Sequence, residues 1–300
     1  MPFDPATTAD RQTDTLQGIL LMCLGVSMFP FLNACSKQLN ITGYPVAEIV
    51  WARFAGHLLF VVVAFLPKRG WRLFAARRPA LQIGRSFLLL ASTAMFVSAI
   101  GRVPLATASA IGFTAPILVT ALSVPLLGET VGPRRWTAVA VGFFGALIII
   151  RPGAGFTDPA VLLILGSSTS YALYQIATRR SGAHDTAETG IVYAALVGTA
   201  AASFVVPFVF EWPHHGFDAV LFLGLGLFGG FGHYLVTRAF QFAPAAVISP
   251  LGYVELIGTT ILGYFAFGNF PDAWTWVGAL VIIASGVYIA ARERTLRRPR

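Results

Sequence analysis

Long apolar segments separated by short polar connections run through the whole chain. A helix needs about 20 largely apolar residues to cross the hydrocarbon core of a bilayer. Ten segments meet this length, at 16–36, 46–66, 81–101, 104–127, 133–150, 159–178, 187–210, 218–240, 243–267 and 273–291. Strands of a membrane barrel would alternate apolar and polar residues over about ten positions, and these segments do not. Because lipid offers no hydrogen-bonding partner for the backbone, the pattern predicts an all-α integral membrane protein with ten transmembrane helices.

The composition supports a membrane location. Hydrophobic residues make up 56% of the chain and charged residues only 11%, whereas soluble domains carry about a quarter charged residues. So few charges leave too little polar surface to face water on all sides, so we expect the lipid bilayer to surround most of the protein.

Basic residues are distributed unevenly between the connections. With the N-terminus placed in the cytoplasm, 17 of the 21 lysines and arginines fall in cytoplasmic loops and ends. This bias follows the positive-inside rule and predicts a multi-pass protein of the bacterial inner membrane with both termini in the cytoplasm. It also explains the net charge of +8 without nucleic acid as a partner.

The second half of the chain repeats the first at an offset of about 140 residues. The ungapped matches are Pro104 with Pro244, Ser109 with Ser249, Gly112 with Gly252, Phe113 with Tyr253, Gly128 with Gly268 and Trp136 with Trp276. Near the starts of the repeats, Ala47-Glu48 matches Ala187-Glu188. Each repeat crosses the membrane five times, which is an odd number, so the second copy must insert in the opposite orientation. Two inverted five-helix repeats, 1–153 and 154–300, typify secondary transporters that bind substrate near the bilayer midplane.

Residues 92–153 resemble the EamA-type members of the drug/metabolite transporter superfamily. The resemblance rests on Pro116-Ile117-Leu118, Leu127-Gly128-Glu129 and a glycine-spaced helix that ends at Arg151-Pro152-Gly153, together with Arg53-Phe54. It implies ten helices in two repeats around a cavity lined by helices 1–4 and 6–9, with helices 5 and 10 outside. Asn269 stands where many relatives carry Glu, which halves any role of that carboxylate. A narrower similarity is to the aromatic amino-acid exporters of YddG type.

Polar side chains inside spans are costly, so they are candidate substrate contacts. These candidates are Asn33, Lys37, Trp51, Arg53, Tyr171, Tyr174, Gln175, His233, Tyr234 and Glu255. Aromatic residues near span centres could stack on a ligand, and we add Phe96, Phe113 and Tyr253. Interhelical hydrogen bonding, packing or snorkelling would explain the same residues without a substrate. Glu255 is the candidate for a coupled proton.

Three prolines within the predicted spans, Pro30, Pro116 and Pro250, are candidate hinges, because proline removes a backbone hydrogen bond. Fixed kinks are the alternative. Histidines and cysteines at metal-ligand spacing are not found, and no nucleotide-binding motif has the required strand context, so we predict no metal and no cofactor.

We therefore expect a secondary transporter that exports small amphiphilic metabolites, above all neutral or aromatic amino acids, by alternating access. A proton-coupled multidrug exporter is the alternative within transport. A membrane-embedded enzyme would need a polar catalytic cluster at one membrane face, and a channel would conduct without binding. The partners expected are a small-molecule substrate and the lipid bilayer, with the protein a monomer or homodimer.

Overall fold

The computed structural model describes residues 5–128, 132–150, 159–182, 184–242 and 249–297. All regular elements in these ranges are helices. The first half contains α1 (Pro5–Thr42), α2 (Val46–Arg69), η1 (Gly70–Phe74), α3 (Pro79–Ile100), α4 (Leu105–Gly112), α5 (Ala115–Leu127) and α6 (Pro133–Ile150). The second contains α7 (Pro159–Ser181), α8 (Ala187–Ser203), η2 (Val206–Phe208), α9 (Gly216–Phe242), η3 (Ser249–Tyr253), α11 (Val254–Phe267) and α12 (Ala273–Arg297). Glu129 and the Arg151-Pro152-Gly153 motif lie outside the described residues.

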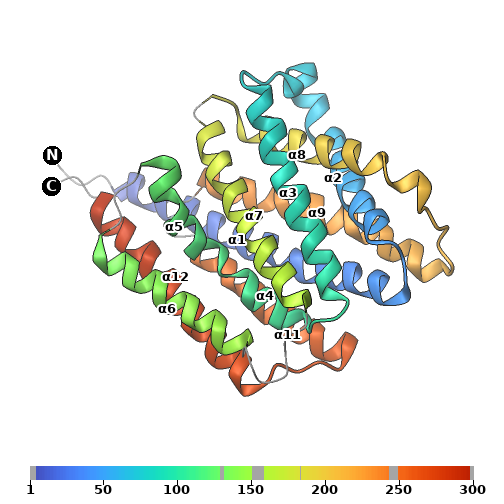
Figure 1. The fold of residues 1–300 in the computed structure, drawn as a ribbon. Coiled ribbons are helices and arrows are strands. Elements are labelled where there is room, and N and C mark those ends of the chain that lie inside the picture. The colour runs from blue at the N-terminus through green and yellow to red at the C-terminus, as the bar shows by residue number, and fades with distance from the viewer. Residues whose placement is uncertain (1–4, 129–131, 151–158, 183, 243–248, 298–300) are drawn as a thin grey trace.

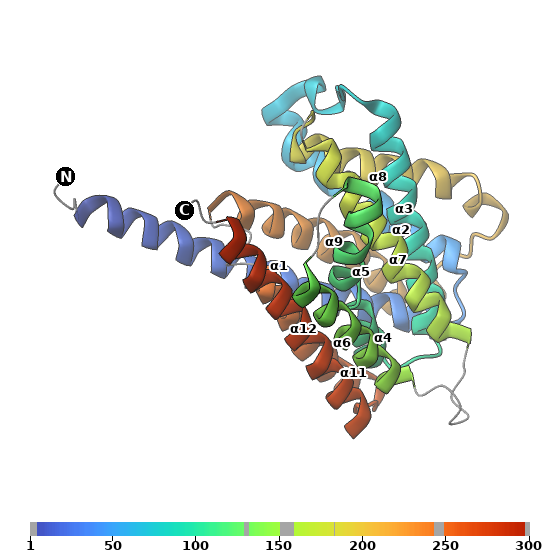
Figure 2. The ribbon, with the colours of Figure 1, turned by 60° about the vertical axis from the view of Figure 1, so that its left-hand side comes forward.

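The helices correspond to the ten predicted spans. Eight of the described helical segments are long and apolar enough to cross a membrane, and two shorter apolar helices follow at Leu251–Phe267 and Ala273–Ile289. Large apolar side chains cover the outside of the bundle, including Leu59, Val63, Phe144, Leu162, Leu223 and Leu280. The start of α1 and the end of α12 lie on the same side of the molecule (Figures 1 and 2), which fits an even number of crossings.

The two halves share details of backbone geometry as well as sequence. α5 ends at Gly128 with φ 67°, and α11 ends at Gly268 with φ 66°. The amide of Gly128 donates to the carbonyls of Ser123 and Val124, and that of Gly268 donates to Gly263 and Tyr264, which stand 140 positions later. Glycine fits this left-handed cap without the steric cost of a Cβ atom. The offset read from the sequence is therefore a structural repeat.

The fifth and tenth spans, α6 and α12, pack against each other at one edge of the bundle (Figure 1). A Cβ atom on Gly145 would lie 2.9 Å from the carbonyl oxygen of Gly278, and one on Gly278 would lie 2.5 Å from that of Gly145. At the other end of the contact, the Ser285 hydroxyl donates to the carbonyl of Ala138 at 2.6 Å. Gly145 with Ser285, and Ala138 with Gly278, are pairs at the 140-residue offset, so the two contacts are images of each other.

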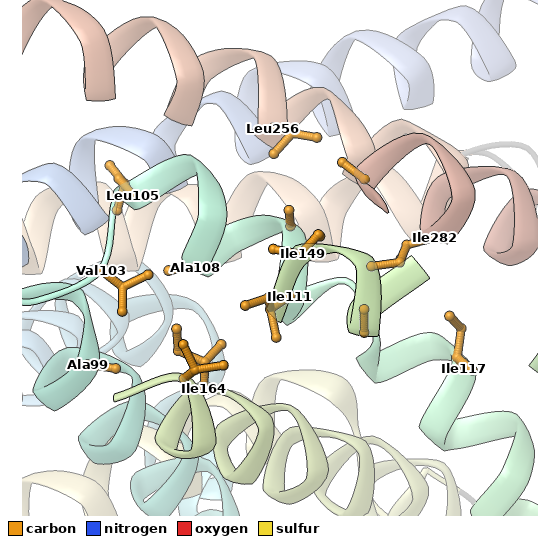
Figure 3. Close-up of a cluster of buried hydrophobic side chains, with 14 of the residues drawn as sticks. Ala99, Val103, Leu105, Ala108, Ile111, Ile117, Ile149, Ile164, Leu256 and Ile282 are labelled. Carbon is orange, nitrogen blue, oxygen red and sulfur yellow. The ribbon is translucent and has the colours of Figure 1, made fainter. Parts of the chain in front are cut away.

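The remaining spans form the body of the molecule. α1 of the first half packs along α9 of the second, and their counterparts at the repeat offset, α7 and α3, pack along each other in the same way. A buried apolar cluster joins this body to α6 and α12 (Figure 3), with Ile111, Ile149, Ile164, Leu256 and Ile282 among its members. The α6–α12 pair thus packs at the edge of the helices that are expected to line a cavity.

The fourth span is broken, which the sequence analysis did not predict. α4 ends at Gly112 and α5 begins at Ala115, so the segment predicted at 104–127 is two helices. The expectation that Pro116 interrupts a continuous helix is wrong, because Pro116 lies in the first turn of α5, where its missing N–H is not needed. Pro30 does lie inside α1, and Pro250 lies in η3.

The ninth span is interrupted at the equivalent position of the second repeat, where the 3-10 helix η3 leads into α11. The rings of Phe113 and Tyr253 meet edge to face across the two breaks, with centroids 5.0 Å apart. These residues match at the repeat offset, so each half contributes one aromatic ring to the same contact.

We predict that Gly145→Ala separates α6 from α12 and lowers the thermal unfolding midpoint in detergent. The added methyl would contact the Gly278 carbonyl and the side chains of Val281 and Ile282 at about 3 Å, and such overpacking costs about 1–3 kcal/mol. Gly84→Ala is the matched control, because a Cβ there meets nothing within 4 Å. Equal midpoints for the two variants would contradict the close contact.

Candidate functional site

Arg53 and Glu255 carry opposite charges in the middle of the bundle. Arg53 lies on α2 and Glu255 in the first turn of α11, and the two lie near each other and near Tyr171 on α7. All three are deep in the protein, yet Arg53 and Glu255 are only half-buried and Tyr171 is exposed. The three groups therefore lie near one another, and each keeps part of its surface accessible.

The two charges do not pair directly. The structure gives Arg53 no ion pair within 4.0 Å and no hydrogen bond to any residue it describes. Glu255 instead accepts a hydrogen bond at Oε1 from the amide of Asn33 on α1, at 3.2 Å. An unpaired guanidinium inside a membrane protein requires water or a ligand. Among the described residues, Arg53 is thus a cation that its neighbours leave without a hydrogen bond or an ion pair.

Two histidines lie beside Arg53. The rings of His57 on α2 and His233 on α9 are stacked, 5.2 Å apart and 9° from parallel, and Phe29 contacts His233 at 5.0 Å. Both imidazoles are within electrostatic range of Arg53. The Nε2 atom of His57 is buried and has no hydrogen-bond partner among the residues that the structure describes. His233 and His57 thus both lie beside Arg53, and the role of His233 in substrate binding stays a prediction.

Tyrosines of α7 form an aromatic wall next to this group. Tyr171 and Tyr174 are stacked with centroids 5.7 Å apart. Beyond Tyr174, a cavity of about 310 Å³ opens between α5 and α7, lined by Val119, Tyr174, Gln175, Ile176, Thr178 and Arg179. Tyr174 therefore borders the cavity on one side and contacts Tyr171, the neighbour of Arg53 and Glu255, on the other.

Several predicted site residues lie elsewhere. Lys37 is buried and donates to the carbonyls of Ile100 and Val103, at 2.6 and 2.8 Å, so it satisfies the end of α3. Trp51 donates to the Ser203 hydroxyl at 2.9 Å. Tyr234 faces Phe60 and Phe65. Phe96 and Phe113 pack against the main apolar cluster, and Tyr253 is held against Phe113.

Polar contacts close the bundle at the end where α2 begins. Glu48 accepts a hydrogen bond from the backbone amide of Glu211, at 3.1 Å. Asp218, in the first turn of α9, accepts one from the Tyr44 hydroxyl at 2.9 Å. Burial raises the pKa of Tyr44, so its hydroxyl stays protonated and can donate.

A matching set of contacts closes the opposite end, where α8 begins. Glu188 pairs with Arg69 at 3.0 Å. Asp185 accepts hydrogen bonds from the Gln82 side chain at 2.9 Å and from the Arg77 amide at 2.6 Å. Burial would raise the pKa of Asp185, but these hydrogen bonds outweigh it and hold that pKa below its usual value. The carboxylate is thus ionised at neutral pH.

The sequence analysis missed most of these end contacts. It matched Glu48 with Glu188 in the repeat but gave neither a partner. Tyr44, Gln82, Asp185 and Asp218 lie in or beside the connections, where charged and polar residues are ordinary. The repeat was the one available signal, because acids placed alike in two inverted halves stand at opposite ends of the bundle.

Comparisons with known proteins agree with this architecture. A family model, the EamA-like transporter family, matches residues 16–151 and 158–291. The S-adenosylmethionine uptake transporter of Rickettsia prowazekii is 26% identical over 93% of this chain and 94% of its own length. The riboflavin transporter of Rhizobium johnstonii is 28% identical over 94% of each. The pseudopaline exporter of Pseudomonas aeruginosa is 27% identical over 92% of this chain and 97% of its own.

A solved structure shares the fold alone. It superposes with a TM-score of 0.64 at 19% identity, over 96% of this chain and 99% of that one. Because the family model covers most of both halves and the named relatives align along their whole length, the identification is made for the full set of spans. The chain belongs to the EamA-like transporter family and is a multi-pass membrane transporter of small molecules rather than an enzyme.

Proposed function

We propose that this protein exports small amphiphilic metabolites, in the first place neutral and aromatic amino acids, by alternating access. One observation carries the proposal: Arg53 and Glu255 lie near each other with part of their surfaces accessible, and they form no ion pair within 4.0 Å. A zwitterion supplies the two charges that this pair lacks.

The head group of an amino acid suits the geometry. Its carboxylate can take two parallel hydrogen bonds from the Arg53 guanidinium. Its ammonium group can donate to Glu255, which Asn33 holds through Oε1 only. A substrate of this kind crosses without leaving a buried charge unpaired, because each charge meets its opposite in the site.

The rest of the site suits an apolar or aromatic side chain. Tyr171 and Tyr174 present stacked rings, and Phe29 with His233 forms another ring contact. Offset-stacked and edge-to-face contacts with such rings favour flat ligands. Relatives named for S-adenosylmethionine uptake, riboflavin transport and pseudopaline export differ in cargo and direction, so the residues of this site support the proposal more than the family does.

Alternating access is supported by the polar contacts at the two ends of the bundle. Glu48 and Asp218 join α2 and α9 to connections at one end, and Glu188 and Asp185 join α8 and its preceding loop to connections at the other. Releasing one set while the other holds would open the central site to one side at a time. Pro30, inside α1, remains a hinge candidate for this motion, and Pro116 and Pro250 remain candidates because they lie beside the breaks in the fourth and ninth spans.

Counterflow in proteoliposomes tests the substrate class. We expect vesicles loaded with unlabelled phenylalanine or leucine to accumulate the labelled amino acid. Arg53→Gln should raise KM about 10- to 100-fold, since a hydrogen bond to a charged group contributes about 1.5–3 kcal/mol. Arg72→Gln, at an exposed position in η1, is the control and should keep the wild-type KM.

Two results of that assay would count against the proposal. If the wild-type protein exchanges none of the amino acids, the proposal that amino acids are the substrates is wrong. An unchanged KM in Arg53→Gln would remove the role of the guanidinium.

A second candidate function, proton-coupled multidrug export, is favoured by the carboxylate of Glu255. This group lies within the spans without an ion pair to Arg53, and such carboxylates are typical of proton relays. If proton movement at Glu255 drives transport, Glu255→Gln should abolish substrate uptake against the substrate's concentration gradient. Counterflow measured at equal pH on both sides of the membrane should continue in this variant. Net flux that ignores the pH gradient in the wild type would rule this candidate out.

We predict opposite effects from removing the two repeat-related acids. Glu188→Gln should open the end where α8 begins, and Glu48→Gln should open the other. In a variant without Cys23 and Cys35, the reporter is Gln175→Cys, which lines the cavity near the Glu188 end. Its labelling by an impermeant maleimide should rise in Glu188→Gln and fall in Glu48→Gln. The contact is partly exposed, so we expect a change of about 2- to 5-fold. The same direction of change in both variants would contradict two opposed gates.

A further inference from the structure

Arg85 is a buried cation that the transport site as described does not use. It lies on α3 with 3% of its surface exposed. The structure gives it no carboxylate partner among the described residues. Its Nε donates to the side-chain oxygen of Gln82 at 2.6 Å, and its Nη1 donates to the Thr178 hydroxyl at 2.7 Å. A charge held this way is stabilised by neutral acceptors, so its position depends on their geometry.

The third partner of Arg85 is an aromatic ring. The guanidinium lies over Tyr174, 5.3 Å from the ring centroid, which is within the range of a cation–π interaction. The Tyr174 hydroxyl makes no hydrogen bond to a described residue. The ring is therefore located by Arg85 on one side and by Tyr171, 5.7 Å away, on another.

Gly190 and Gln82 further restrict the position of the Arg85 guanidinium. A Cβ atom on Gly190 of α8 would overlap its Nη2 atom, so α8 approaches closely only because this residue is glycine. The amide of Gln82 donates to Asp185 at 2.9 Å while its oxygen accepts from Arg85. Gln82 thus bridges the Asp185 carboxylate, at the end of the bundle, to the Arg85 cation.

These contacts form a continuous chain from the end of the bundle to the central site. Asp185 holds Gln82, Gln82 holds Arg85, and Arg85 holds the ring of Tyr174. Tyr174 stacks on Tyr171, which lies near Arg53 and Glu255. Tyr174 also borders the cavity of about 310 Å³. The ring that Arg85 fixes is therefore placed where a ligand would pass or bind.

We propose that Arg85 is a positioning residue that fixes the Tyr171–Tyr174 ring pair and thereby sets the preference of the transporter for ring-bearing over aliphatic substrates. The part of this proposal that concerns substrates rests on the proposed function. Arg85 does not contact the substrate, and it acts through the orientation of Tyr174.

Two variants displace the guanidinium by different means. Arg85→Gln removes the charge and the cation–π contact. Gly190→Ala keeps Arg85 and pushes its Nη2 atom away. Gly84→Ala, one residue from Arg85 on the same helix and with open space around it, is the control. Agreement between the two displacing variants would separate positioning from a general effect of lost charge.

The first readout needs no substrate. The full chain, with 3-fluorotyrosine incorporated at position 174, is examined by ¹⁹F NMR in detergent micelles. We expect the resonance to shift or broaden in Arg85→Gln and Gly190→Ala and to match the wild type in Gly84→Ala. An unchanged resonance in both displacing variants overturns the proposal.

The second readout is selectivity in counterflow. The ratio of KM for leucine to KM for phenylalanine should fall at least 3-fold in both displacing variants, with their leucine KM close to the wild-type value. A shifted resonance with an unchanged ratio also overturns the proposal, because ring position would then not govern selectivity. If the wild type exchanges no amino acid, the proposed function fails, whereas the ¹⁹F resonance still decides whether Arg85 positions Tyr174.

Discussion

A charged side chain within the bilayer must find an opposite charge, a hydrogen-bonding partner or water, and this constraint organises the whole molecule. Lys37 finds carbonyls at the end of α3. Arg85 finds Gln82, Thr178 and the ring of Tyr174. Arg53 finds no hydrogen-bond partner among the described residues. The first two cations therefore tie helices together, and the third is the cation that we propose for substrate binding.

Hydrophobicity and the repeat predicted most of the fold. Span length followed from bilayer thickness, and the match of Gly128 with Gly268 reappears as two left-handed helix caps. The break between Gly112 and Ala115 was not predictable from apolar length, because both parts of the span are equally apolar. Nor could one sequence distinguish Lys37 from Arg53: the difference lies in carbonyls more than 60 positions away that reach only the first.

Inversion of the two halves brings equivalent positions of both repeats together, but the charges of the proposed site are not equivalent. A position near the middle of the bilayer in one repeat has its image near the middle in the other, so both halves can contribute to one space. Phe113 and Tyr253 contribute equivalent aromatic rings. The charges, in contrast, come from different spans of the two repeats, Arg53 from the second and Glu255 from the ninth. The scaffold is thus nearly symmetric, while the chemistry of the proposed site is not, and this asymmetry would give a molecule bound there a defined orientation.

The two ends of the bundle also differ in the kind of bond that holds them. Glu48 has 2% of its surface exposed and accepts from a backbone amide, whereas Glu188 pairs with an Arg69 whose side chain is 59% exposed. Dissolved ions screen an open ion pair far more strongly than a sheltered hydrogen bond. Concentrated electrolyte on the Glu188 face would therefore loosen only that end. The resting bias of the carrier would then depend on the salinity of one compartment and be nearly indifferent to that of the other.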